Sequence, residues 1–258
     1  MEEVLLTALG VGGATVVGAA IGFFFKNLSH KFSDIVLSFA AGVMLAAAVL
    51  GLIVPSVEYG IAMEFGVGIA LLMTVGGIFV GALCLNGMDK MVPHLHKLSA
   101  PDMEAHKGNE KLNKVLLFVM AIAIHNLPEG IAAGVGFGSG NTTDALLIAG
   151  GIALQNIPEG MVIIAPMLAA GLSTKKTFLY AALTGVVEVV GTLIGYFAVS
   201  ISVAILPFAL AFAGGTMLYV ISDEMIPETH AHGEQRGATY ALLIGFCFML
   251  VCDILLGG

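Results

Sequence analysis

The sequence predicts an all-α, polytopic membrane protein of eight transmembrane helices, built as a single domain over residues 1–258. The first observation is composition: 58% of the residues are hydrophobic and 11% are charged, whereas soluble domains are about 45–50% apolar and about 25% charged. The second is that apolar runs near the length of about 20 residues needed to cross a bilayer recur along the chain. The third is the distribution of basic residues between these runs.

Eight apolar runs separated by polar connections are predicted to be the spans. They cover roughly residues 4–25, 34–56, 66–86, 115–136, 145–170, 177–199, 203–222 and 238–256. Polar side chains mark two of their beginnings, since "NTTD" precedes the fifth span and Ser173 and Thr174 precede the sixth. Such residues are favoured at helix N-termini because their side-chain oxygens accept hydrogen bonds from free backbone N–H groups.

The ten lysine and arginine residues all lie in alternate connections. They follow the first, third, fifth and seventh spans, in that order: Lys26 and Lys31; Lys90, Lys97, Lys107, Lys111 and Lys114; Lys175 and Lys176; Arg236. Because basic residues concentrate on the cytoplasmic side of membrane proteins, these connections are predicted to be cytoplasmic and both termini extracytoplasmic. The expected location is the bacterial inner (plasma) membrane.

Histidines gather in the same connections. Six of the seven lie there: His30, His94, His96, His106, His230 and His232. The longest connection, residues 87–114, is predicted to be a mobile cytoplasmic loop. A solvated loop is the favoured interpretation of these histidines, and weak metal capture at a cytoplasmic exit is the alternative.

Two similar motifs carry polar residues to the middle of predicted spans: "HNLPEG" at 125–130 and "QNIPEG" at 155–160. In each motif the first and fifth residues are four apart, so both project from one face of a helix. The asparagine that follows the first residue flanks that face. Each motif also contains a proline, Pro128 or Pro158, which is predicted to kink its helix and free backbone oxygens beside the polar side chains.

Glu129 and Glu159 of the motifs and Glu188 of the sixth span are predicted to lie at a similar depth in the membrane, and three buried glutamates require a common explanation. An ionised group at the centre of a transmembrane helix costs about 2.5–3.5 kcal/mol, so these groups must face each other, water or a cation. Imidazole, amide and carboxylate donors together favour Zn²⁺, Fe²⁺, Mn²⁺ or Cd²⁺. The cation is expected to be the transported substrate rather than a resident cofactor, bound as one ion or as two adjacent ions. The predicted metal-binding residues are His125, Asn126, Glu129, Gln155, Asn156, Glu159 and Glu188.

Other functions are less favoured. An intramembrane metalloprotease would need the order H-E-x-x-H, which is absent, so no enzymatic activity is expected. A proton-coupled carrier of a small organic solute would account for the carboxylates but not for the histidine and amide groups. A buried network of protonated glutamates would not require two prolines. With a net charge of −8 and no basic patch, nucleic acid is not an expected partner.

The motifs resemble the ZIP family of divalent metal transporters, in particular its bacterial GufA-like branch. Besides the two proline motifs, the resemblance covers "SFAAGVMLAAAVLGLIVPSVE" (38–58), "GVVEVVG" (185–191) and "YVISDEMIPETH" (219–230). It implies a homodimer of subunits with eight helices each, embedded in the lipid bilayer, that carries zinc or another divalent metal into the cytoplasm by alternating access. Helices 1, 4, 5 and 6 would move against a scaffold of helices 2, 3, 7 and 8.

The resemblance also implies how the ligands divide. One metal position would use His125, Glu129, Gln155 and Glu159, and the adjacent position would use Asn126, Asn156 and Glu188, bridged by the two motif glutamates. Acidic residues of the seventh helix, namely Asp223, Glu224 and Glu228, would lie near the cytoplasmic exit. Many relatives have histidine in place of Gln155, and some have aspartate in place of Asn156. This chain therefore has one nitrogen donor fewer than the relatives with histidine, and one negative charge fewer than those with aspartate.

Overall fold

The computed structural model confirms the all-α prediction. It describes residues 1–24, 30–64, 66–91, 110–137, 140, 142–169, 171–231, 233 and 235–256, and every regular element in these ranges is helical. Most of the predicted cytoplasmic loop, including His94, His96 and His106, lies outside the described residues, as does His232.

Over the described residues, the helices form eight antiparallel rods, one for each predicted span. Three rods contain more than one helical element, and the short η4 connects α8 to α9. The elements are α1 (Glu2–Phe24); α2 (His30–Ala46), η1 (Ala47–Ile53) and α3 (Val54–Ala62); α4 (Val67–Met91); α5 (Glu110–Gly136); α6 (Thr142–Val162) and α7 (Ile164–Ala169); α8 (Thr174–Ile201), followed by the short η4 (Val203–Ile205); α9 (Leu206–Val220), η5 (Ile221–Met225) and α10 (Ile226–His230); and α11 (Gln235–Leu256).

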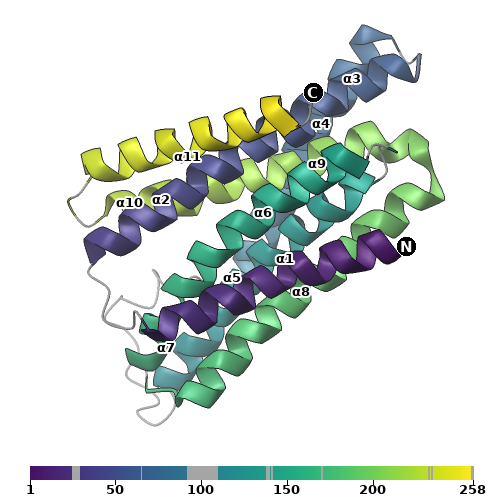
Figure 1. The fold of residues 1–258 in the computed structure, drawn as a ribbon. Helices are drawn as coiled ribbons and strands as arrows, with labels where there is room; N and C mark the ends of the chain where they lie inside the picture. Colours follow the sequence, from purple (N-terminus) through teal and green to yellow (C-terminus); the bar gives the residue numbers. More distant parts are fainter. Residues whose placement is uncertain are drawn as a thin grey trace.

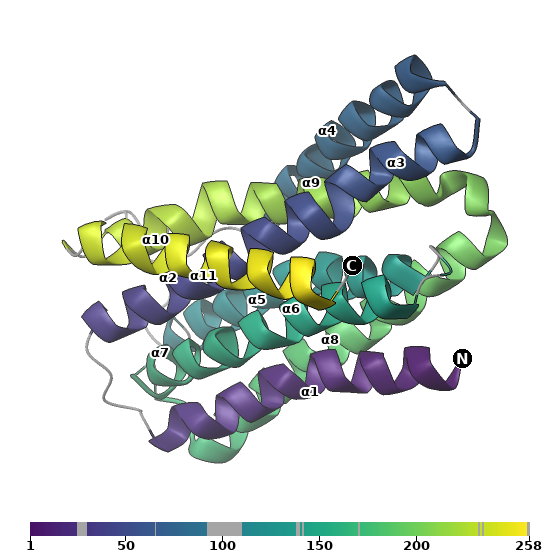
Figure 2. The same cartoon turned by 45° about the horizontal axis from the view of Figure 1, so that its top comes forward.

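Six rods in the described part of the chain are long and apolar enough to cross a membrane. The other two are α5 and α6 with its extension α7, which carry the polar motifs. An even number of antiparallel rods leaves the chain ends on one side, and the N-terminus and the end of α11 do lie toward the same end of the bundle (Figures 1 and 2). The six long apolar helices make this an integral membrane protein.

The kinks expected at the prolines of the two motifs stay a prediction, and the wider helical turns lie ahead of two other prolines. Both α5 and α6 are assigned as continuous α-helix through Pro128 and Pro158, in close packing with α8 and α1. Wide π-helical turns instead precede Pro55 and Pro227, in η1 and η5. A proline ring clashes with the carbonyl one turn back, and a wider turn relieves that clash.

Two rods extend well beyond their predicted ends. The second runs as continuous helix from His30 to Ala62 rather than over residues 34–56. The seventh continues as helix to His230 rather than ending at residue 222, so Asp223 and Glu224 lie within its π-helical turn. Both ring nitrogens of His230 are engaged there, with Nδ1 2.8 Å from the Ile226 carbonyl and Nε2 3.1 Å from the Thr239 hydroxyl. This histidine joins α10 to α11, and its contacts are structural.

The rods divide into two groups of four. In the first group α1 packs against α6 and α8, and α5 packs against α8. In the second group α4 packs against α9, and α2 packs against α11. The groups meet where α2 faces α6 and α5 faces α9, which is visible in the two views of the ribbon (Figures 1 and 2).

Glycines bring helix backbones together within each group. A Cβ atom built at Gly12 in α1 would collide with the carbonyl of Gly185 in α8, and the reverse also holds. In the second group, Gly42 of α2 lies equally close to the backbone of α11. Across the boundary, Gly51 and Gly151 meet only side chains. Small residues that allow such close approach are typical of helix contacts in membranes.

The Gly12 contact gives a matched pair of neighbouring substitutions. Gly12→Ala should lower the free energy of unfolding by about 1–3 kcal/mol, since the added methyl group overpacks a backbone contact. Gly13→Ala meets no atom within 4 Å and should change stability by less than about 0.5 kcal/mol. Fluorescence-detected size-exclusion chromatography after heating measures both, and equal melting temperatures would contradict the packing described here.

Candidate metal centre

The seven predicted metal-binding residues come from three neighbouring helices of the first group. α5 carries His125, Asn126 and Glu129; α6 carries Gln155, Asn156 and Glu159; α8 carries Glu188. Five of them are buried, with at most 1% of each residue exposed, while His125 and Glu159 are half-buried. Polar side chains at this burial are stable only when they are satisfied by other polar groups or ions.

Glu188 is the centre of a hydrogen-bond network that joins four helices. Its Oε1 accepts a hydrogen bond from the Thr15 hydroxyl in α1 at 2.7 Å and a very short one from the Asn126 amide in α5. Its Oε2 accepts a hydrogen bond from the Asn156 amide in α6 at 2.7 Å. The Asn156 nitrogen also donates to the Val11 carbonyl at 3.2 Å.

The same residues leave several acceptors unpaired. Within the described part of the chain, five buried side-chain oxygens of the motifs have no hydrogen bond of normal geometry: both of Glu129, Oε1 of Gln155, and Oδ1 of Asn126 and Asn156. The amide nitrogen of Gln155 is likewise unpaired, and Gln155 lies near enough to Glu129 to interact with its carboxylate. An unsatisfied buried acceptor costs about 1–3 kcal/mol, and more when it is charged. All five are oxygens that coordinate divalent cations, so the donor set fits a metal ion.

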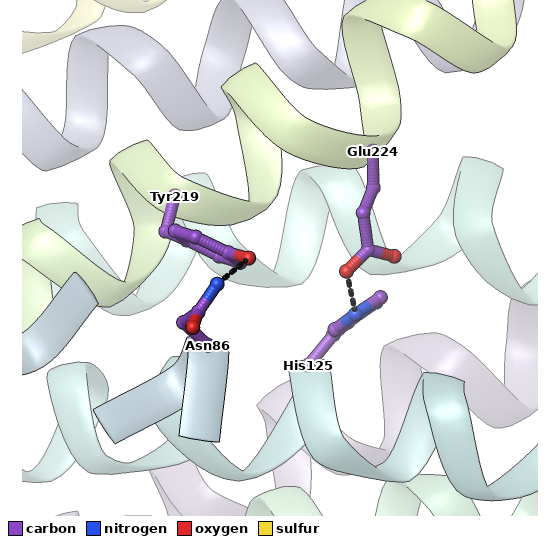
Figure 3. Close-up of polar contacts among 4 residues, drawn as sticks. All are labelled: Asn86, His125, Tyr219 and Glu224. Carbon is purple, nitrogen blue, oxygen red and sulfur yellow. Dashed lines mark hydrogen bonds and ion pairs between the residues drawn. The ribbon is translucent and has the colours of Figure 1, made fainter. Parts of the chain in front are cut away.

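His125 contacts a residue of the second group of helices. Its Nε2 lies 2.7 Å from Oε1 of Glu224 in η5 (Figure 3). Next to this pair, Asn86 of α4 donates a hydrogen bond to the Tyr219 hydroxyl at 2.7 Å, and Tyr219 and Glu224 point toward the same side of their rod (Figure 3). Residues five apart diverge on an α-helix, but a π turn bonds residues i and i+5 and returns them to nearly one face.

The charged groups are near one another without forming a closed cluster. Glu159 lies within electrostatic reach of both His125 and Glu129, and Glu129 of Glu188 as well. No three His, Cys, Asp or Glu side chains among the described residues are gathered closely enough to hold a metal by themselves. Amide oxygens of the motifs would therefore have to complete any coordination shell.

Sequence reasoning missed two residues of this region. Thr15 was not predicted to contact Glu188, although it shares the buried small-residue face of α1 with Gly12, Gly18 and Gly22. A hydroxyl on such a face is a usable signal, because a close helix contact brings it to a neighbour. Glu224 was expected only near the exit, because its contact with His125 depends on the π turn. A cavity of about 150 Å³ between η1, α3, α6 and α11 contains none of the predicted residues.

Buried polar side chains between apolar helices define the class of the protein: a membrane protein with a polar site within its span. A family profile described as ZIP Zinc transporter matches residues 101–253. The chain is 41% identical over 253 residues to the zinc transporter GufA of Myxococcus xanthus, covering 98% of each. It is 35% identical over 253 residues to the zinc transporter ZupT of Chlorobaculum parvum, covering 95% of this chain and 94% of the relative.

The similarity to a human relative also covers nearly the whole chain. The chain is 32% identical over 333 residues to the zinc transporter ZIP11 of Homo sapiens, covering 99% of this chain and 97% of the relative. The protein belongs to the ZIP family. It is a transporter and not an enzyme, as the sequence predicted.

Glu129 and Asn156 differ in how fully their side chains are hydrogen-bonded, so apolar substitutions at the two positions should have opposite effects on stability. Glu129→Met replaces two unpaired oxygens with apolar surface and should raise the free energy of unfolding by about 1–3 kcal/mol in a chelating buffer. Asn156→Leu removes two hydrogen bonds from Asn156 and should lower it by about 1–3 kcal/mol. Thermal unfolding in detergent measures both; a destabilised Glu129→Met protein would show that Glu129 is paired.

Proposed function

We propose that the protein carries divalent transition-metal ions across the membrane, with Zn²⁺ as the main substrate and Fe²⁺, Mn²⁺ or Cd²⁺ as further candidates. The observation that carries this proposal is the set of five buried, unpaired oxygens on α5 and α6. A dehydrated cation needs several oxygen or nitrogen ligands at once, and this set offers oxygens on side chains buried between the helices. The names of the relatives, all zinc transporters, support zinc.

The primary ion position is formed by His125, Glu129, Gln155 and Glu159. Its support is the proximity of these groups on the facing sides of α5 and α6 and the two unpaired oxygens of Glu129. Two glutamates neutralise one doubly charged ion, which removes the cost of carrying a charge into the bilayer. The single imidazole and the amide of Gln155 favour ions of intermediate softness without strict selectivity.

The division into two groups of helices supports alternating access. Glycine contacts lock backbone to backbone inside each group, whereas the boundary is packed through side chains, as at Gly51 and Gly151. Closely packed groups move as rigid bodies, and side-chain interfaces allow small sliding or hinge motions between them. The first group, which carries the metal-binding residues, moves against the second and exposes the ion to one side and then the other.

Orientation and assembly come from the charge pattern and the family. The basic connections face the cytoplasm and the termini face outward in the bacterial plasma membrane. The family resemblance supports metal influx and a homodimer. The same ligands would bind the ion in either direction of transport, so the proposal of influx rests on the family resemblance alone.

Removal of either motif glutamate should abolish transport. Glu129→Ala and Glu159→Ala each leave one carboxylate against a doubly charged ion, so initial ⁶⁵Zn²⁺ uptake into proteoliposomes should fall at least about 100-fold. Glu2→Ala, in the exposed first turn of α1, is the control and should retain wild-type uptake. Uptake by either motif variant at the wild-type rate would overturn the assignment of the site.

Uptake should also slow in acid. A protonated imidazole or carboxylic acid cannot coordinate a metal, so protons and metal compete for the site. The initial rate of zinc uptake at fixed free zinc should therefore fall as the external pH is lowered from about 8 to about 5. A rate that stays constant over this interval would argue against coordination by these groups.

A further inference from the structure

The contact between His125 and Glu224 crosses the boundary between the two groups, and a second polar side chain of the seventh rod lies beside it. Nε2 of His125 is 2.7 Å from Oε1 of Glu224, and the Tyr219 side chain points to the same side of its rod (Figure 3). Tyr219 and Glu224 are five residues apart, and the π turn that the chain enters between them brings both to nearly one face. The seventh rod therefore presents two polar groups to α5, one after the other along its axis.

Tyr219 is the nearer of the two to the end of the bundle that holds both chain termini. The seventh rod begins at that end with α9 and continues through η5 toward the other end (Figure 1). The two side chains are about one helical turn apart, and a turn is about 5.4 Å long. A slide of the first group by one turn toward the termini would carry His125 from Glu224 to Tyr219.

The packing at the boundary suits such a movement. At Gly51 and Gly151 the two groups meet through the side chains of Ile148, Ala47 and Met249. Apolar contacts are non-directional, and the side-chain ridges of packed helices repeat with each turn, so a one-turn shift restores similar packing. Hydrogen bonds have narrow limits of distance and angle. The polar contacts therefore select the positions at which the slide stops.

Asn86 of α4 holds the tyrosine hydroxyl on this side of the rod. Its amide nitrogen donates to the Tyr219 hydroxyl oxygen at 2.7 Å, which directs the hydroxyl proton away from Asn86. A hydroxyl can donate to a bare imidazole nitrogen or accept from an N–H group, so it can pair with either tautomer of His125. Gly81 and Gly215 already pack α4 and α9 backbone to backbone. Joining these two helices is therefore not a sufficient role for the Asn86–Tyr219 bond.

We propose that Glu224 and Tyr219 are two successive docking points for His125 during the return of the carrier after it has released its ion, and that Asn86 is a positioning residue for the second. His125 is at the first docking point in the structure, and a one-turn slide of the first group brings it to the second. This inference rests on the alternating movement proposed above. It concerns the step in which His125 binds no ion, so it does not change the set of metal ligands.

Double electron–electron resonance between spin labels on the two groups measures these positions. Ile201 at the end of α8 and Tyr240 near the start of α11 are exposed, belong to different groups and lie near opposite ends of the bundle, so a slide toward the termini lengthens the distance between them. The three native cysteines are first replaced by serine. The labelled protein is studied in lipid nanodiscs with a chelator, diluted with unlabelled protein so that each distance lies within one subunit.

Two docking points predict two distances in the wild type and opposite shifts in two variants. Glu224→Met removes the first docking point and should favour the longer distance, whereas Tyr219→Phe removes the second and should favour the shorter one. Loss of a hydrogen bond made in only one state should change the ratio of the two populations by about 2- to 10-fold. Asn86→Leu should act in the same direction as Tyr219→Phe.

Tyr196→Phe is the matched control. It also removes one phenolic hydroxyl, but from α8, where the ring packs against Phe197, and it should leave the ratio unchanged. A single wild-type distance that no variant moves would overturn the inference, as would Glu224→Met and Tyr219→Phe variants that shift the populations in the same direction. Asn86→Leu tests the same docking point if Tyr219→Phe does not fold. The proposed function is tested apart from this, because a wild type that carries no zinc into proteoliposomes would refute transport whatever distances are measured in the chelator.

Discussion

The first group of helices is organised around one buried carboxylate. Glu188 lies within the bundle, where each of its oxygens must be satisfied by protein donors. The three donors, from Thr15, Asn126 and Asn156, all have short side chains. Short side chains reach a common point only if the helix axes are close, and glycines along α1, α5, α6 and α8 permit that approach.

The same arrangement explains why stability and function conflict in this part of the molecule. The donors of the asparagine amides are used to satisfy Glu188, so their oxygens, with those of Glu129 and Gln155, remain unpaired in the interior. A bound cation would satisfy the oxygens that lie within its coordination shell. Natural proteins commonly retain such locally unfavourable arrangements at functional sites, where other packing offsets the cost.

The contact of His125 with Glu224 adds a link between the two groups. It joins α5 to the π-helical turn of the seventh rod, at the boundary where the groups meet (Figure 3). Any relative movement of the groups must change this contact. The metal-binding histidine proposed here therefore has surroundings that depend on the position of the two groups, whereas the Glu188 network lies entirely within one group.

Much of the fold could be predicted from the sequence, because apolar length and charge distribution act along the chain. The eight rods follow the predicted apolar runs, and Glu129 and Glu159 lie within electrostatic reach of each other. The site could be predicted less fully. The contact of Glu224 depends on a π turn ahead of Pro227, and the contact of Thr15 depends on how closely α1 meets α8.

The loop histidines and the division of the ligands between one or two ions stay predictions. Helix packing is a property of facing surfaces from distant segments, and no local pattern in the chain encodes which side chains meet. The glycine faces show that contacts are close, but not which helices make them.

Anomalous X-ray diffraction from crystals soaked in zinc tests the central claim most directly. The account predicts an anomalous peak between α5 and α6, within coordination distance, about 2.0–2.2 Å, of carboxylate oxygens from both Glu129 and Glu159. A fully occupied zinc site elsewhere in the membrane region, with these two glutamates turned away from each other, would contradict it.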